Sequence, residues 1–514
     1  MSLSDRQKGH SKKHTGKDRA AEVANILSEL IITFALVLVV RAFVMEAFRI
    51  PTGSMASTLK GAHFRLRCPQ CGYGYDRGFL PHEYSRPQDT IPSNAVPPPP
   101  TRCPSCGNYP RSGRERTTSV SNGDRILVLK CMYQFLEPKR WDVIVFKNPL
   151  EPPINYIKRL VGLPNEKIEI IDGDVYIDGK ISRKPPKVQN ELWMPVYDND
   201  FRPVRPNQRS FNQKKSWQQP FRNVAGSAWG TDEANPTAFG LNSSVDKINA
   251  MVYDSQLAND FKATYAYDNV GDYKYMPNCS DLMLRLYARQ TNRKGIVGME
   301  LSKYETHYRA SVNWAGEMVI EAVKDSDVMT LARKSIEAPA LNEPILVKFA
   351  NVDHQLIFQF GREKLTHDLG RLPADAERQP TDVEPEVRIF GSGELTLSHV
   401  AIFRDIHYTT GKYANSGEAG RATEENPFKL KKDQFFVLGD NSPNSQDGRW
   451  WSREGIGNNG EMFAAGVVPR QYLVGKALFV YWPSGFKPFK TFPFAIVPNV
   501  GKMRFIYGGS NKQQ

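Results

Sequence analysis

The chain has 514 residues, of which 40% are hydrophobic and 24% charged, and its formal net charge is +13. This length allows about two to four domains, and the apolar content is ample for folded cores. The basic residues are scattered beyond the N-terminus, with neither a helix-turn-helix nor an aromatic ribonucleoprotein strand. We therefore expect no nucleic acid as a partner. Anionic lipid headgroups explain the N-terminal charges better.

The N-terminal segment 1–21 is basic, and an apolar stretch from Ile26 to Phe48 follows it. The uncharged centre of this stretch, Leu30–Val40, is shorter than the ~20 residues of a clean membrane span. A cleaved secretion signal would need small residues at A-x-A spacing after the apolar run, and RAFVMEAF offers none. An uncleaved anchor tolerates charges at its ends, because they can snorkel or pair. We predict a transmembrane anchor over 22–48 with a cytoplasmic N-terminus.

A turn with the sequence FRIPTGSMAST follows the apolar stretch and carries Ser54 between a glycine and a methionine. A serine hydroxyl needs a base to become a nucleophile. None of the nine histidines lies in a local G-x-S-x-G pattern. Ser57 stands where the S-x-x-K pattern would place a lysine. If Ser54 is a nucleophile rather than an exposed turn residue, its base must come from elsewhere in the chain.

Two cysteine knuckles, CPQCG and CPSCG, come next and supply Cys68, Cys71, Cys103 and Cys106. Each can turn its backbone amides toward sulfur, with the glycine accepting a positive φ. Four thiolates can bind zinc tetrahedrally in a closed structural site. Two disulfides are the alternative, because the segment is expected outside the reducing cytoplasm. We favour zinc, since paired knuckles are a stronger signal than scattered cysteines.

From Asp124 onward the sequence is typical of β-strands: DRILVLKCMYQF, WDVIVFKN, NYIKRLVG and the hairpin pattern EKIEIIDGDVYIDGK. If NYIKRLVG is a strand, Tyr156, Lys158 and Leu160 share one face. Burial between such neighbours lowers the pKa of a lysine. A neutral amine near pH 7 can then accept a proton from a serine hydroxyl. The alternative is a lysine that snorkels from a sheet edge.

The composition changes at about residue 185 to a polar stretch with weak periodicity, and alternating apolar runs over about 290–412 then predict a β-sandwich. This region weakly resembles a laminin-G or concanavalin-like jelly roll. Sugar or peptidoglycan binding is one role that this resemblance implies. A spacer or docking role is the other, and we favour it.

The segment FFVLGDNSPNSQDGRW then places a dense group of short polar side chains after a β-strand pattern. By itself this could be only a hydrogen-bonded loop. However, Ile50–Leu59, Gly123–Lys130, Tyr156–Pro164 and Leu438–Arg449 together resemble, in order and content, the motif set of type I signal peptidases. These are membrane-anchored Ser-Lys endopeptidases that remove signal peptides from exported proteins, and the preceding anchor resembles theirs as well.

The resemblance implies a role for each matching side chain. Ser54 is the expected nucleophile and Lys158 the general base, with Ser445 orienting the lysine amine. Asp447 and Arg449 are expected to form a supporting ion pair. The oxyanion hole is expected to use the backbone N–H of Ser54 and the hydroxyl of Thr52, donors that act on charge appearing in the transition state.

The chain departs from the family pattern at a few positions. Thr52 replaces the commoner serine and keeps the hydroxyl, whereas Asn165-Glu166 replaces Gly-Asp and Gly448 replaces a frequent serine. None of these changes removes an expected catalytic group. Typical family members also lack the cysteine-containing insert.

We therefore expect a mainly β fold with a single transmembrane helix and the β core that the family shares with self-cleaving SOS repressors. The expected segments are a basic tail (1–21), the anchor (22–48), a core in three parts (49–66, 120–185 and 430–514), a zinc-ribbon-like insert (67–119) and a second insert (186–429) that contains the sandwich.

The expected activity is removal of N-terminal signal peptides from preproteins by a Ser-Lys dyad. Structural zinc is expected, and no cofactor is expected for catalysis. The expected partners are preproteins, the lipid bilayer and the protein-export machinery, and the expected location is the cytoplasmic membrane with the catalytic domain on its outer side. The alternative is an inactive, anchored scaffold that acts through its zinc ribbon and sandwich.

Overall fold

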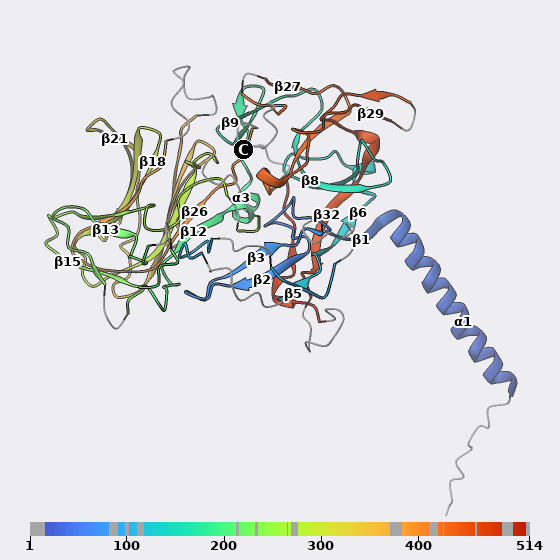
Figure 1. Ribbon diagram of the computed structural model, residues 1–514, viewed down its shortest axis with the longest axis horizontal. Coiled ribbons are helices and arrows are strands. Elements are labelled where there is room, and N and C mark those ends of the chain that lie inside the picture. Colours follow the sequence, from blue (N-terminus) through green and yellow to red (C-terminus); the bar gives the residue numbers. More distant parts are fainter. Residues whose placement is uncertain are drawn as a thin grey trace, which may run out of the picture.

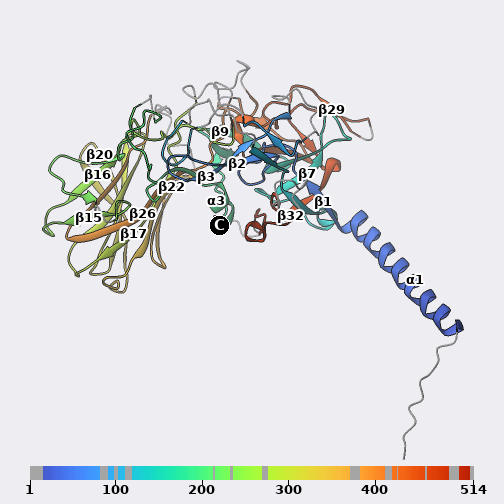
Figure 2. The same ribbon diagram turned by 60° about the horizontal axis from the view of Figure 1, so that its bottom comes forward.

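The computed structural model describes most of the chain. The described ranges are 16–81, 91–97, 102–109, 118–211, 215–231, 235–264, 266–268, 276–370, 383–410, 420–424, 426–457, 460–485 and 497–509. Residues 1–15 of the basic tail, segments 82–90, 98–101 and 110–117 of the zinc-ribbon-like insert and segment 411–419 of the second insert lie outside these ranges. The molecule consists of one projecting helix, a central β core and a lateral β-sandwich (Figures 1 and 2).

The N-terminal helix α1 spans Gly16–Val39 and continues as a short π-helical turn, η1 (Val40–Val44). Residues Glu22–Val44 are long and apolar enough to cross a membrane, and none of this window is buried against the protein. Figure 1 shows α1 extending away from the core. The predicted anchor ran to residue 48, but the helical part ends at Val44 because the following residues pair with a strand of the core.

The core contains one antiparallel sheet built from both ends of the chain. Its strands in spatial order are β1 (Met45–Arg49), β6 (Arg125–Leu129), β32 (Leu473–Trp482), β7 (Val143–Lys147), β8 (Asn155–Gly162), β28 (Gln434–Leu438) and β31 (Val468–Pro469), with β33 (Arg504–Phe505) on β32. Alternate residues of β6, such as Ile126 and Val128, are buried in the core. The DRILVLKCMYQF segment is a strand only to Leu129, and a short helix, α2 (Met132–Phe135), follows.

A small second sheet carries the predicted hairpin. It has the order β11 (Lys180–Ile181), β10 (Asp174–Ile177), β9 (Lys167–Ile171) and β27 (Phe428–Lys429). Both Asp-Gly turns adopt positive φ at both residues, with 47° and 84° at Asp172-Gly173 and 49° and 80° at Asp178-Gly179. This is the backbone that two-residue hairpin turns require, so the hairpin prediction is confirmed.

The lateral β-sandwich consists of two antiparallel sheets packed around one apolar core. The first sheet has the order β14 (Gly230–Thr231), β15 (Phe239–Asn242), β26 (Glu394–Arg404), β17 (Leu282–Gln290), β22 (Ile345–Val352), β23 (Gln355–Phe360) and β24 (Glu363–Asp368), with β12 (Met194–Asp198) on β26. The second has the order β13 (Phe221–Asn223), β16 (Asn249–Tyr253), β25 (Val387–Gly391), β18 (Ile296–Lys303), β19 (Thr306–Asn313), β20 (Glu317–Lys324) and β21 (Asp327–Ser335).

The sandwich is larger than the predicted 290–412 region. Strands β12 to β16 come from the polar stretch that shows weak periodicity in the sequence. These strands are short, and three of them, β12, β15 and β16, pair with β25 or β26, which lie far along the chain. Their strand conformation therefore depends on distant partners, which a local pattern does not reveal.

The knuckle element folds around a further sheet, with the order β3 (Gly74–Gly78), β2 (His63–Arg67), β5 (Thr118–Ser121) and β4 (Asn94–Ala95). In Figure 1 it lies below the core, between the core sheet and the sandwich. Its cysteines pack against Phe211 and Trp217 of the second insert. The two inserts are therefore in direct contact.

Buried charges also join the sandwich to the core. Lys184 follows β11 and forms ion pairs with Asp353 and Asp405, the latter at 2.9 Å. Lys303 of β18 lies 3.8 Å from Asp174 of β10. All five side chains are buried. Removing one partner from such a cluster leaves an uncompensated buried charge, so this junction holds the sandwich firmly on the core.

Candidate active site

Ser54 lies in the turn that follows β1, where the flanking side chains Met55 and Ala56 are fully buried. The turn is bonded to a distant loop. The backbone N–H of Asn441 donates to the carbonyl oxygen of Ser54 at 3.0 Å, and the Asn441 side-chain amide donates to that of Gly53 at 3.1 Å. The position of the serine is therefore set by the loop after β28 as well as by its own turn.

Lys158 projects from β8 toward this turn. Its Nζ atom lies 2.6 Å from Oγ of Ser54 and 5.6 Å from the centre of the Tyr156 ring. The side chain is buried, and burial lowers the pKa of Lys158 to about 8, with a further lowering by Arg449 and opposing effects of Asp447 and Asp440. A serine hydroxyl and a deprotonatable amine in contact have the geometry required for nucleophilic catalysis.

The loop after β28 is held by an ion pair between Asp447 and Arg449. Nη2 of Arg449 lies 2.7 Å from Oδ2 of Asp447, and neither side chain is exposed. Asp447 also accepts a hydrogen bond from the backbone N–H of Gly439, and Arg449 donates to Oγ of Ser442. These bonds are charge-assisted, the stronger kind in proteins, and they fix the loop that contacts the Ser54 turn.

Ser445 lies beside the Ser54 turn, but its hydroxyl is not bonded to Lys158. Its Oγ is buried and has no hydrogen-bond partner within the described part of the chain. A Cβ atom at Gly439 would lie 2.1 Å from this Oγ and 2.5 Å from the carbonyl oxygen of Ser54, so the two serines approach each other across Gly439. The orienting role of Ser445 stays a prediction.

The structure shows the environment of two positions, 52 and 448, at which the chain departs from the family pattern. Thr52 is exposed, two residues before Ser54. Gly448 has no room for a side chain, because a Cβ atom there would lie 2.8 Å from the Phe436 ring and 2.9 Å from the carbonyl oxygen of Gly466. A serine at position 448 would therefore require neighbouring residues to move.

Sequence reasoning missed a second buried ion pair, between Arg159 and Asp440. Nε and Nη2 of Arg159 each lie 2.7 Å from one oxygen of Asp440, and Nη1 donates to the carbonyl oxygen of Trp141 at 2.9 Å. Neither side chain is exposed. Strand alternation places Arg159 opposite Lys158, and a fully buried arginine is almost always paired. From the expected burial of Arg159, a carboxylate partner for it could have been sought in the sequence.

Sequence reasoning also missed Tyr267 and Asp268, which belong to the second insert. The ring of Tyr267 packs against Gly53, and Asp268 accepts a hydrogen bond of 3.1 Å from the side-chain amide of Asn444. Both residues come from a stretch with no strand or helix pattern, and no sequence signal points to them. The insert therefore reaches the immediate surroundings of Ser54.

The four knuckle cysteines converge at one point. The Sγ atoms of Cys68 and Cys106, and those of Cys71 and Cys103, are 3.7 Å apart, and all four lie within 4.8 Å of one another. A disulfide requires about 2.05 Å, whereas Zn–S bonds of about 2.3 Å in tetrahedral geometry separate the sulfurs by about 3.8 Å. The glycines that follow each knuckle have φ of 75° and 72°, as predicted. The donor set fits zinc.

Comparison with solved structures finds partial likenesses. A carbohydrate-binding module of family 66 from Bacillus subtilis covers 36% of this chain and 95% of its own, with 9% identity and a TM-score of 0.24. Sheep galectin-11 covers 25% of this chain and 92% of its own, with 13% identity and a TM-score of 0.19. These values are too low to support any functional argument.

Comparison with protein families and known sequences finds similarity over two segments of the chain. The family described as "Signal peptidase, peptidase S26" matches residues 102–221 and 394–482. Signal peptidase I of Rickettsia typhi is 32% identical over 149 residues, which are 29% of this chain and 41% of that protein. Signal peptidase I of Rickettsia massiliae is 29% identical over 178 residues, 34% of this chain and 50% of that protein. The chain thus spans half or less of these relatives' lengths. Over these segments, the chain is similar to the signal peptidase S26 family.

Proposed function

We propose that this chain is a membrane-anchored serine endopeptidase that removes signal peptides from exported preproteins, with Ser54 as nucleophile and Lys158 as general base. The observation that carries this proposal is the 2.6 Å contact between Nζ of buried Lys158 and Oγ of Ser54. Burial disfavours the ammonium form, so a neutral amine is available near physiological pH. The relatives named signal peptidase I support the substrate class.

The proposed reaction has two steps. The neutral amine of Lys158 takes the proton of the Ser54 hydroxyl as Oγ attacks the carbonyl carbon of the scissile peptide. The backbone N–H of Ser54 and the hydroxyl of Thr52 donate to the resulting oxyanion. The lysine ammonium then gives its proton to the leaving amine, and an acyl ester remains on Ser54. Water, deprotonated by the lysine, hydrolyses the ester and restores the serine.

In this proposal, the substrate adds as an extended strand beside the site. β28 pairs with β8 only at Arg159, Leu160 and Gly162, so along this side the half of β8 that leads to Lys158 has no partner strand among the described residues. In the described part of the chain, β1, which leads to Ser54, pairs with β6 on one side only. Open strand edges bind peptides through main-chain hydrogen bonds. The resemblance to signal peptidases implies small residues at the first and third positions before the cut.

The anchor sets the location of the site in this proposal. The apolar helix to Val44 leads directly into β1 and then, within a few residues, to Ser54, which keeps the cut close to the bilayer surface. The basic residues before the helix favour a cytoplasmic N-terminus. The catalytic domain then lies on the outer side of the cytoplasmic membrane, where preproteins emerge from the export machinery. The bilayer and that machinery are the proposed partners.

We propose a structural role for zinc held by Cys68, Cys71, Cys103 and Cys106. All four positions would be filled by protein ligands, which is typical of structural and not catalytic zinc. Catalysis by the serine and lysine pair needs no cofactor. The bound metal would join the two knuckles and, through their contacts with Phe211 and Trp217, support the packing of the second insert.

The proposal is tested with the full-length protein in detergent and a purified preprotein. Ser54→Ala and Lys158→Ala are each expected to reduce cleavage by at least about 10³-fold, since members of a catalytic unit are not replaceable by one another. The matched controls are Ser119→Ala and Lys167→Ala, two exposed positions away from the site. Cleavage by Lys158→Ala at the wild-type rate would refute the dyad, and absence of cleavage by the wild type would favour the inactive scaffold.

A further inference from the structure

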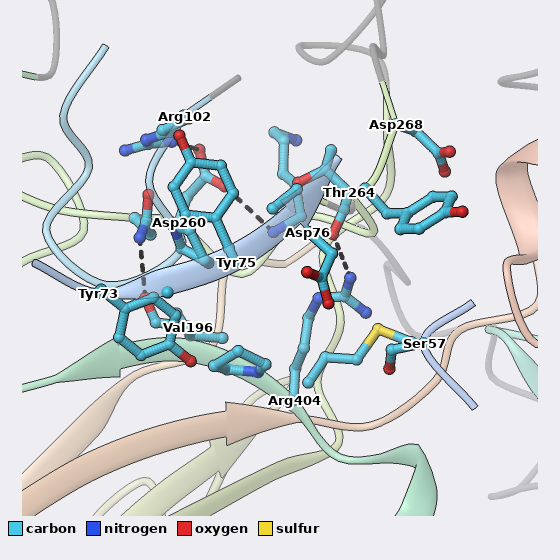
Figure 3. Close-up of a pocket in the computed structure, with 18 of the residues that line it drawn as sticks. Ser57, Tyr73, Tyr75, Asp76, Arg102, Val196, Asp260, Thr264, Asp268 and Arg404 are labelled. Atoms are coloured by element: carbon cyan, nitrogen blue, oxygen red, sulfur yellow. Dashed lines mark hydrogen bonds and ion pairs between the residues drawn. The ribbon is translucent and has the colours of Figure 1, made fainter. Parts of the chain in front are cut away.

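A cavity of about 310 Å³ lies between the loop after Ser54, the knuckle element and the second insert. Figure 3 shows its lining, with Ser57 at one end and Tyr73 and Arg102 toward the other. Pockets with a volume of roughly 300 Å³ or more accept small ligands or peptide side chains. Most of its walls belong to the two inserts and not to the β core.

The cavity is continuous with the proposed catalytic turn. Ser57, three residues after Ser54, lines it, and so do Tyr267 and Asp268. Tyr267 packs on Gly53, and Asp268 holds Asn444, the neighbour of Ser445. A chain that passes Ser54 and continues over the Ser57 side of the turn therefore enters this cavity.

The lining suits a polypeptide segment. Tyr73, Tyr75 and Tyr109 give aromatic walls with polar tips. The cationic Lys60 and Arg102 are each paired with a carboxylate, Asp76 and Asp260 respectively, the latter pair at 3.4 Å. The other two cationic lining residues, Lys262 and Arg404, donate to the backbone carbonyl oxygens of Met276 and Thr264. Charges that are already paired do not select a strongly charged ligand. Aromatic side chains provide rigid contact area for apolar and amphipathic groups at low entropic cost.

The position of the cavity decides which part of a preprotein it meets. The segment before the cut remains connected to the membrane, and the edges of β1 and β8 that it would join lie on the side of α1. The cavity lies on the opposite side, between β3 and β12, toward the sandwich (Figure 1). We propose that this cavity binds the residues of the preprotein that immediately follow the cut. This inference rests on the proposed peptidase function.

The test compares two substrates with the same signal sequence. One is a complete preprotein, and the other is a peptide that ends at the cut as a p-nitroanilide and so lacks every later residue. Ala266→Trp fills the cavity from a half-buried lining position, and Tyr109→Ala removes part of its wall. The matched control is Val328→Trp, at an exposed position of β21 in the sandwich.

For both cavity variants, the ratio of kcat/KM for the preprotein to kcat/KM for the anilide is expected to fall about tenfold, the scale on which one pocket contact discriminates between substrates. Val328→Trp is expected to keep the wild-type ratio. An unchanged ratio in both cavity variants, including one produced by an equal loss on both substrates, overturns the cavity proposal. If the wild type cleaves neither substrate, the peptidase function is overturned instead, so the two failures are distinguishable.

Discussion

The ring of Tyr267 lies directly against Gly53, the residue before Ser54. A Cβ atom at position 53 would lie 2.3 Å from Cε1 of this ring, and Gly53 does not have a positive φ. Glycine is therefore required here by the tyrosine and not by the backbone conformation. The tyrosine is itself fixed, because its hydroxyl donates to Ala62 and its carbonyl oxygen accepts from the backbone of Gly78. A residue of the insert thus shapes the Ser54 turn.

This contact predicts a compensating pair of substitutions. Gly53→Ala should lower kcat for a preprotein by about 10²-fold, because a displacement of about 1 Å in the nucleophile has effects of this size. In Gly53→Ala/Tyr267→Ala the ring is gone, and kcat should recover toward that of Tyr267→Ala alone. Single-turnover cleavage measures the effect, with Tyr267→Phe as the control that keeps the ring. A double variant no more active than Gly53→Ala would contradict the steric explanation.

Lys158 predicts a pH dependence of cleavage. Its pKa is lowered to about 8 by burial, and the proposed base is the neutral amine. As the pH falls below about 8, the amine becomes protonated and kcat/KM should fall about tenfold per pH unit, so that roughly a tenth of the plateau value remains at pH 7. Above about 8 the rate should level off. Rates of preprotein cleavage between pH 6 and pH 10 provide the measurement.

The control for this profile is Lys158→Arg, which should be inactive at every pH because a guanidinium is not deprotonated in proteins. A wild-type rate that keeps rising about tenfold per pH unit up to pH 10, toward the ordinary lysine pKa of 10.5, would show that the base is not a buried amine.

The sequence predicted those features whose causes are local. Strand alternation correctly placed Lys158 beside Tyr156, Asp-Gly dipeptides marked the hairpin turns, and the knuckle glycines at 72 and 107 have the expected positive φ. Tyr267 could not be found in this way, because its contacts with Gly53 and Gly78 join segments about 200 residues apart in sequence. The same holds for the early strands of the sandwich, which pair with β25 and β26.

The knuckle element predicts a link between zinc and folding. Protein purified without chelator should contain about one equivalent of zinc, and Cys106→Ser should lose it and lower the Tm, because metal binding contributes directly to folding. Cleavage should also decrease, since Arg77 and Gly78 of this element both donate to the carbonyl oxygen of Tyr267. Elemental analysis and calorimetry measure the two effects.

The matched control for Cys106→Ser is Cys131→Ser, which changes a cysteine outside the four-sulfur cluster and should keep both zinc and Tm. Less than about half an equivalent of zinc in fresh protein, together with an absence of free thiols at the four positions, would support disulfides instead.

The buried pair of Arg159 and Asp440 predicts a large loss of stability on truncation. Asp440→Ala leaves the guanidinium of Arg159 without its carboxylate in a site with no exposure, which typically costs about 3–5 kcal/mol. The exposed pair of Lys334 and Glu363 has a similar N–O distance, 2.7 Å, but Glu363→Ala should cost no more than about 1 kcal/mol because water screens the charges. Urea unfolding of both variants gives the comparison. Since Arg159 adjoins Lys158 on β8, Asp440→Ala should also reduce cleavage in the fraction that remains folded. Equal unfolding midpoints for Asp440→Ala and Glu363→Ala would mean that the buried pair does not hold β8 in place.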